Sequence, residues 1–269
     1  MGEILIPVIV LSVIAIVCAV ILTLSAVFFS VPTDETTEKI RDCLPGANCG
    51  ACGYSGCDGY ANALGAKTET RTNLCIPGAD KTAKEIATIL GVEAADVVEK
   101  IAHVGCGGTC NIVQKRFDYQ GHKSCLTANL NYSGDRLCTY ACLGYGDCAK
   151  VCPQNAIDIV DGIAKVNVSK CIGCGICAKA CPNHIIHIIN QTSKVTVNCS
   201  NHDKGAVTRK ACTVGCIACG KCVKTCPKGA ISIVDNLATI DYEKCTGCGA
   251  CVEACPVKCI HPVVIDCGK

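Results

Sequence analysis

The chain has little of what normally builds a large hydrophobic core. Its 269 residues include no Trp, one Met and three Phe, so aromatic side chains add little buried area. No G-x-G-x-x-G sequence joins a predicted strand to a helix, and no Ser/His/Asp or Cys/His arrangement suggests a nucleophile, so no dinucleotide or catalytic site is expected. No stripe of basic and aromatic residues suggests nucleic-acid binding. Something besides side-chain burial must therefore stabilise the fold.

Cysteine is abundant instead, with 29 residues. A disulfide framework and a metalloprotein are the competing interpretations. The run from Cys216 to Cys226 contains four cysteines in close succession. Disulfide partners need Cα atoms about 4.4–6.8 Å apart in a set geometry, which does not require such dense runs. Several thiolates converging from one loop suit a metal cluster, and the spacing favours that interpretation.

An uncharged apolar segment extends from Ile4 to Val31. About 20 apolar residues are enough to span a bilayer. A cleaved signal peptide is disfavoured because no Lys or Arg precedes the segment and no A-x-A site follows it. Lys39 and Arg41 follow directly, so the positive-inside rule predicts an outside N-terminus and a cytoplasmic body. We expect one retained helix in the inner (cytoplasmic) membrane, with Cys18 as a small apolar residue within it.

The body contains an internal repeat. When the sequence is shifted by 74 residues, segment 138–186 falls on segment 212–260, and 24 of the 49 aligned positions are identical. Each copy has alternating residues around a two-residue turn, at Asp161-Gly162 and at Asp235-Asn236. Such turns tolerate the positive φ of a tight hairpin. The repeat therefore predicts two small α+β modules, in which bound clusters replace much of the core.

The cysteine runs identify what these modules resemble. The pattern C-x2-C-x2-C-x3-C-P is typical of bacterial ferredoxins, in which the fourth cysteine ligates the other cluster. The resemblance covers roughly residues 138–256 and implies two [4Fe–4S] clusters in each module. In the second module it implies the ligand sets Cys216, Cys219, Cys222, Cys255 and Cys245, Cys248, Cys251, Cys226. In the first module it implies the complete set Cys171, Cys174, Cys177, Cys152. Zinc, the alternative, needs four-ligand sets without this exchange.

The first module departs from the pattern at one position, because Tyr145 stands where the second module has Cys219. Cys138 is the first candidate for the missing thiolate. The set would then be Cys138, Cys142, Cys148 and Cys181. In the alternative, Cys138 completes an additional cluster with three further candidates. These are Cys106, Cys110 and Cys125. The sequence leaves both alternatives open.

A different cysteine motif follows the apolar segment. "CLPGANCGACGYSGC" and the later "NLCIPGA" contain four closely spaced candidates. They are Cys49, Cys52, Cys57 and Cys75. A further [4Fe–4S] cluster is favoured over a zinc knuckle because the rest of the chain already has cluster motifs. The segment "TAKEIATILG" behind them predicts an amphipathic helix, and Cys43 is expected to be an unliganded thiol.

One apolar helix, this motif and paired ferredoxin runs, in this order, resemble the B-subunit family of Rnf complexes, which are membrane ferredoxin:NAD+ oxidoreductases coupled to sodium or proton transport. The resemblance implies a subunit that accepts electrons from reduced ferredoxin and passes them to membrane partners, with NAD chemistry on another subunit. A polyferredoxin arm of a hydrogenase or heterodisulfide reductase is one alternative. Another is a non-redox binding protein whose fold is stabilised by clusters or zinc.

The expected organisation has four parts. They are a transmembrane helix (1–31), a four-cysteine [4Fe–4S] domain (32–100), a first ferredoxin-like module with an N-terminal extension (101–190) and a second module (191–269). Five [4Fe–4S] clusters are expected, or six if the additional cluster exists. The sequence assigns no role to Cys199, Cys212, Cys259 or Cys267, and it does not identify the transported ion.

Overall fold

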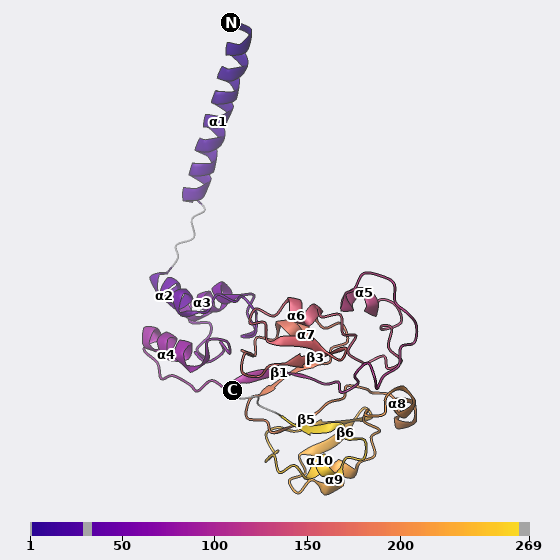
Figure 1. Ribbon diagram of the computed structural model, residues 1–269. Coiled ribbons are helices and arrows are strands. Elements are labelled where there is room, and N and C mark those ends of the chain that lie inside the picture. The colour runs from indigo at the N-terminus through magenta and orange to yellow at the C-terminus, as the bar shows by residue number, and fades with distance from the viewer. Residues whose placement is uncertain (1, 29–33, 264–269) are drawn as a thin grey trace.

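The computed structural model describes residues 2–28 and 34–263, in which short helices and two-stranded sheets follow one long helix (Figure 1). The helices are α1 (Gly2–Phe28), α2 (Glu35–Cys43), α3 (Cys57–Gly65), α4 (Ala79–Leu90), α5 (Cys125–Asn129), α6 (Asp147–Lys150), α7 (Ile176–Ala180), α8 (Gly205–Ala211), α9 (Lys221–Thr225) and α10 (Ala250–Ala254). The strands are β1 (Lys100–Val104), β2 (Ile157–Val160), β3 (Ile163–Val166), β4 (Ile186–Asn190), β5 (Val195–Val197), β6 (Ile231–Val234), β7 (Leu237–Ile240) and β8 (Ile260–Pro262).

Helix α1 stands apart from the body of the protein (Figure 1). Its window Val8–Ser25 has a mean hydropathy of 3.0 and contains no buried residue. The Thr23 hydroxyl donates to the Ala19 carbonyl at 2.9 Å, so this polar group is satisfied within the helix. Among the described residues, α1 is the one helix that is long and apolar enough to cross a membrane.

Helices α2, α3 and α4 form a small helical unit after α1. The Asp34 carboxylate caps α2 by accepting from the Thr36 N–H at 3.2 Å, and Gly91 ends α4 with φ of 67°. The expected amphipathic helix is α4. The unit buries a compact group of apolar side chains, namely Ile40, Tyr60, Leu64 and Ile86. These helices hold the first cysteine motif against one small core.

The repeated segments fold as two hairpins, as the turn residues predict. Strands β2 and β3 pair antiparallel around Asp161 and Gly162, whose φ values are 53° and 74°. Strands β6 and β7 pair in the same way around Asp235 and Asn236, with φ of 46° and 63°. Both residues of each turn are left-handed, which matches the right-handed twist of a hairpin.

Each module also has a second antiparallel sheet, whose first strand lies upstream of the repeated segment. Strand β1 pairs with β4, and β5 pairs with β8. Between these sheets and the hairpins, the buried core consists largely of cysteines and aliphatic residues. A protein with so few aromatic residues therefore places its cysteines where other proteins place Phe or Leu.

The three folded parts contact one another in order along the chain. Figure 1 shows the first module between the helical unit and the second module. The segments that follow β1 and β5 meet at the junction of the modules, where the Gly107 N–H donates to the Asn198 carbonyl at 2.9 Å. Ser200 Oγ also donates to the Gly105 carbonyl at 2.9 Å. The junction is thus tied by backbone and side-chain hydrogen bonds.

Candidate iron–sulfur sites

The helical unit brings the first four candidate cysteines together as cage 1. Its members are Cys49, Cys52, Cys57 and Cys75. Burial raises the pKa of the Cys75 thiol to about 11, a backbone hydrogen bond with Gly78 opposes this, and the three neighbouring thiols raise it further. Four thiols from the loop before α3, from α3 and from the loop before α4 therefore share one site.

A second set, cage 2, lies in the first module. Cys152, Cys171, Cys174 and Cys177 line a pocket of about 340 Å³. The Ala156 N–H donates to Cys152 Sγ at 3.3 Å. Such N–H···S bonds stabilise charge on cluster ligands and help to set reduction potentials. The structure thus brings together the four residues that the ferredoxin spacing predicts.

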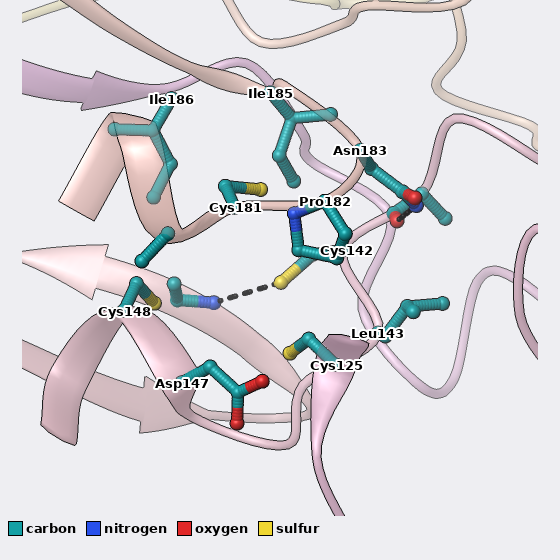
Figure 2. A pocket seen from close by; sticks show the side chains of 13 residues that line it. Cys125, Cys142, Leu143, Asp147, Cys148, Cys181, Pro182, Asn183, Ile185 and Ile186 are labelled. Atoms are coloured by element: carbon teal, nitrogen blue, oxygen red, sulfur yellow. Dashed lines mark hydrogen bonds between the residues drawn. The ribbon is translucent and has the colours of Figure 1, made fainter. Parts of the chain in front are cut away.

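A third set, cage 3, surrounds a pocket of about 350 Å³ in the same module. Figure 2 shows the sulfur atoms of Cys125, Cys142, Cys148 and Cys181 around one space. Burial raises the pKa of the Cys148 thiol to about 12, and its neighbours Cys142, Cys125 and Cys181 raise it further. The Ala164 N–H donates to Cys142 Sγ at 3.4 Å, the dashed line in Figure 2.

Cage 3 differs from the first expectation, because the structure places Cys125 in it and Cys138 elsewhere. The reason is a contact between distant segments. The Asp147 carboxylate accepts from the Ser124 hydroxyl at 2.6 Å and from the Leu126 N–H at 3.1 Å. These bonds fix the start of α5, and therefore Cys125, beside α6. Spacing along the chain carries no signal for such a contact.

The loop that lacks a thiol keeps the ferredoxin backbone. Gly144 and Gly146 flank Tyr145 with φ of 75° and 84°, as glycines of φ 72° and 80° flank Cys248 in the second module. The Tyr145 hydroxyl donates to Asp135 Oδ2 at 3.1 Å. The loop therefore keeps the backbone conformation of a cluster-binding loop. Its central side chain, Tyr145, hydrogen-bonds to Asp135 and contributes no ligand.

The second module contains two further sets. Cage 4 consists of Cys216, Cys219, Cys222 and Cys255. Burial raises the pKa of the Cys222 thiol to about 11, and the other three thiols raise it further. Cage 5 consists of Cys226, Cys245, Cys248 and Cys251, which line a pocket of about 320 Å³. Both sets combine three cysteines of one run with the last cysteine of the other, as the spacing predicts.

Cage 4 has a fifth thiol beside it, to which the sequence assigned no role. Cys259 Sγ lies 3.6 Å from Cys255 Sγ and also hydrogen-bonds to the Cys216 sulfur. This bond lowers the pKa of Cys216 to about 6, whereas the pKa of Cys259 is raised. Ile185 occupies the corresponding position of the first module, next to cage 3. In the described part of the two modules, a thiol therefore stands beside the candidate ligands of cage 4, whereas an apolar side chain stands at the equivalent place beside cage 3.

The remaining candidates do not form one group. The sequence offers Cys106, Cys110 and Cys125 together as ligands of an additional cluster, but Cys125 lies in cage 3 and Cys110 is exposed. Cys106 instead lies close to Cys138. Cys43 donates to the Lys39 carbonyl at 3.3 Å. Cys267 lies outside the described residues.

Three family models match the parts of the chain that hold the cages. "4Fe-4S dicluster domain" matches residues 215–259, "4Fe-4S binding domain" matches residues 164–187 and "Putative Fe-S cluster" matches residues 44–77. With the mixed helix and strand content of the fold, these matches define an electron-transport protein of the ferredoxin-like [4Fe–4S] class. The α+β expectation for the modules agrees with this class.

Relatives over nearly the whole chain give the particular family. The chain is 42% identical to the B subunit of the Na+-translocating ferredoxin:NAD+ oxidoreductase complex of Acetobacterium woodii, over 97% of this chain and 78% of the relative. It is 38% identical to the B subunit of the proton-translocating ferredoxin:NAD+ oxidoreductase complex of Clostridium ljungdahlii, over 91% of this chain and 87% of the relative. It is also 38% identical to the B subunit of the ion-translocating oxidoreductase complex of Methanosarcina acetivorans, over 84% of this chain and 86% of the relative. The chain belongs to the B-subunit family of Rnf complexes.

Proposed function

We propose that this chain is a membrane-anchored relay, which accepts electrons from reduced ferredoxin and passes them to partner subunits of an ion-pumping ferredoxin:NAD+ oxidoreductase. The proposed cofactors are [4Fe–4S] clusters in cages 1 to 5. The observation that carries the proposal is that cages 1, 2 and 3 adjoin one another in sequence and that cages 4 and 5 exchange ligands, since electron transfer slows steeply with distance.

Cages 1 and 2 are joined across the boundary between the helical unit and the first module. Lys179 Nζ donates to the Cys49 carbonyl at 3.0 Å. Burial is the main reason that the pKa of Cys174 is raised, and the Cys49 thiol of cage 1 is near enough to raise it further. Clusters held by these two cages would therefore be direct neighbours.

Cages 2 and 3 are neighbours within the first module. Cys177 of cage 2 is one of the thiols that raise the pKa of Cys148 in cage 3, after burial and the thiols of cage 3 itself. In the second module, cage 4 takes Cys255 from the run that supplies most of cage 5, and cage 5 takes Cys226 in return. This exchange keeps the two clusters of each module close together.

The ligand pattern supports iron–sulfur clusters rather than zinc. Within residues 2–28 and 34–263, no group of three or more His, Cys, Asp or Glu side chains is packed tightly enough to hold a single metal ion. A zinc ion draws its four ligands to bonding distance of one centre. A cubane spreads its four thiolates over four corners, which suits sets that combine three cysteines of one run with one cysteine of another.

The names of the relatives support an assembly with other subunits, and we propose that NAD chemistry takes place on one of those. We also propose the four-part division at residues 31, 100 and 190, and a single membrane span with the N-terminus outside. Helix α1 supplies the apolar length for this anchor. The clusters would then face the cytoplasm, where a soluble ferredoxin is available.

The free energy released by electron transfer is sufficient to drive ion transport. Two electrons moving through a 100 mV drop release about 4.6 kcal/mol, because about 30 mV corresponds to 1.4 kcal/mol for a two-electron step. Moving one charge against 100 mV requires about 2.3 kcal/mol. A modest potential drop across the complex can therefore drive ion transport, with this chain supplying the electrons.

The test uses the full chain purified in detergent without oxygen. Oxidised chain is mixed with a reduced two-cluster ferredoxin, and cluster reduction is followed by loss of visible absorption and by EPR. We expect several one-electron equivalents per chain, all at low potential. A chain that contains iron–sulfur clusters but accepts no electrons from ferredoxin contradicts the relay, and a chain that contains mainly zinc contradicts the cofactor.

A further inference from the structure

Four buried or half-buried cysteines outside cages 1 to 5 meet at the junction of the two modules. We call them the intermodule set; they are Cys106, Cys138, Cys199 and Cys212. They line a pocket of about 320 Å³, the same size as the pocket of cage 5. The set is therefore comparable in size and composition to the candidate cluster sites.

Each module contributes two equivalent members. Cys106 follows β1 by two residues, and Cys199 follows β5 by two residues. Cys138 and Cys212 correspond in the 74-residue repeat, and each stands four residues before the first cysteine of its ferredoxin run. This explains why the second module, whose own cages are complete, still contains Cys212.

The four thiols are close to one another. A methyl group on Gly108 would lie 3.6 Å from Cys212 Sγ and 3.7 Å from Cys106 Sγ, so both sulfur atoms lie against this glycine. Burial is the main reason that the pKa of Cys138 is raised, and the nearby Cys106 and Cys212 thiols add to it. Cys138 in turn is near enough to Cys199 to raise the pKa of that thiol.

Three polar groups donate hydrogen bonds to sulfur atoms of the set. The Cys142 N–H donates to Cys106 Sγ at 3.4 Å, and the Cys216 N–H donates to Cys199 Sγ at 3.2 Å. Asn201 Nδ2 donates to Cys138 Sγ at 3.3 Å. The same kind of N–H···S bond is made to Cys152 and to Cys142 in cages 2 and 3, and it favours a charged, cluster-bound sulfur.

A buried cysteine usually packs as a small apolar side chain. The contact with Asn201 distinguishes the intermodule set from that ordinary role. Its side chain is 1% exposed. Its Oδ1 atom accepts from the Asp203 N–H at 2.6 Å and from the Thr208 hydroxyl at 3.3 Å. These bonds orient the amide so that its donor group faces Cys138. A buried amide directed at sulfur is better matched by a thiolate than by a thiol.

We propose that the intermodule set binds a sixth [4Fe–4S] cluster, which connects the two ferredoxin modules. Loading takes up four iron and four sulfide ions, and the four thiols release their protons as they bind. Each module would supply two of the four ligands. One thiol follows the module's first strand, and the other precedes its ferredoxin run.

This cluster would fill a gap in the proposed relay. Cys142 belongs to cage 3 and Cys216 to cage 4, so the two backbone N–H donors join the intermodule set to one cage in each module. One electron would leave the reduced cluster of cage 3, reduce the intermodule cluster from the 2+ to the 1+ state and continue to cage 4, or travel in reverse. This role rests on the proposed relay function, whereas the presence of the cluster does not.

The test counts iron and acid-labile sulfide per full-length chain, prepared without oxygen. We expect about 24 of each in the wild-type chain, because six clusters contain four iron and four sulfide ions each. The double variant Cys138→Ala/Cys212→Ala should retain about 20 of each. The matched control is Cys43→Ala/Cys110→Ala, which removes two thiols that belong to none of the cages, and it should retain about 24.

A wild-type count of about 20, with no change in the double variant, overturns the proposal, and so does zinc bound at one ion per chain. If the double variant does not fold, the native mass of the wild-type chain decides between five and six clusters. The relay role has a separate readout. In freeze-quench EPR, electron equilibration between the two modules should slow at least tenfold in the double variant, and an unchanged rate overturns the connecting role.

Discussion

Lys179 Nζ donates a hydrogen bond to the carbonyl oxygen of Cys49 at 3.0 Å, which ties the loop of cage 1 to helix α7 of the first module. The two residues are 130 positions apart in the chain, so the bond fixes the approach of two separately folded parts. Gly50 lies against the same ammonium group. The spacing of cages 1 and 2 therefore depends on a contact that one substitution removes.

We expect Lys179→Met to slow electron transfer between the clusters of cages 1 and 2 by up to about fivefold, since an exposed charged contact contributes about 0.2–1 kcal/mol to holding the parts together. Freeze-quench EPR of the reduced chain measures this rate. Lys224→Met is the control, because Lys224 is an exposed lysine of helix α9 in the second module. Equal rates in both variants would show that the contact does not set the spacing.

Cage 3 gives a second prediction, because its fourth thiol comes from outside the ferredoxin run. Cys125→Ala should lose the cage 3 cluster or convert it to a three-iron form, so the iron content should fall by about one to four atoms per chain. EPR of the oxidised chain would detect the three-iron form.

The control for this variant is Cys110→Ala, which removes an exposed thiol of the same module and should leave the iron content unchanged. If Cys125→Ala keeps all its iron and shows no three-iron signal, Cys125 is not a ligand and the cage 3 assignment is wrong.

The fifth thiol beside cage 4 leads to a third prediction. The Cys259 thiol hydrogen-bonds to the Cys216 sulfur, and hydrogen bonds to sulfur stabilise the more negative, reduced cluster. Cys259→Ile introduces the residue found at the same position of the first module. We expect it to lower the potential of one cluster by about 20–60 mV, taking 59 mV as about 1.4 kcal/mol for one electron.

An EPR-monitored redox titration measures this shift. The other clusters should keep their potentials, because Cys259 contacts only cage 4 among the cages of the described chain. A uniform shift of all clusters, or an upward shift of the cage 4 cluster, would contradict the hydrogen-bond explanation.

His103 provides a pH-dependent contact between the modules. Its ring lies on β1, and Nε2 is 3.3 Å from the Val197 carbonyl on β5. Burial lowers the pKa of His103 to about 4, well below its value in the unfolded chain. The unfolded chain therefore binds a proton first, and stability is lost as the pH falls from about 6.5 towards 4.

From this group we expect a loss of about 1 kcal/mol in the free energy of unfolding between pH 7 and pH 5.5. His103→Gln keeps a donor but does not titrate, so its thermal midpoint should fall less over this range. Thermal unfolding without oxygen at both pH values measures the difference. Parallel pH profiles for the two proteins would assign the acid sensitivity to other groups.

Local chemistry explains what could be predicted from the sequence. The uncharged segment predicts α1, and the turn residues at 161–162 and 235–236 predict the hairpins, because neither feature depends on distant contacts. The ferredoxin spacing also predicts the membership of cages 2, 4 and 5, since three ligands of each come from a single loop. The motif before Cys57 predicts cage 1 for the same reason.

Which distant thiols come together depends on the folded chain. The repeat aligns Cys125 with Cys199, but in space Cys125 joins cage 3, and Cys106 is the counterpart of Cys199. Asp147 holds Cys125 in place through bonds to the start of α5, and the junction of two modules gathers the intermodule set. The number of thiols that each loop presents follows from the sequence alone. Packing between segments far apart in the chain determines which loops meet, because the spacing of residues along the sequence does not give their distances in the folded protein.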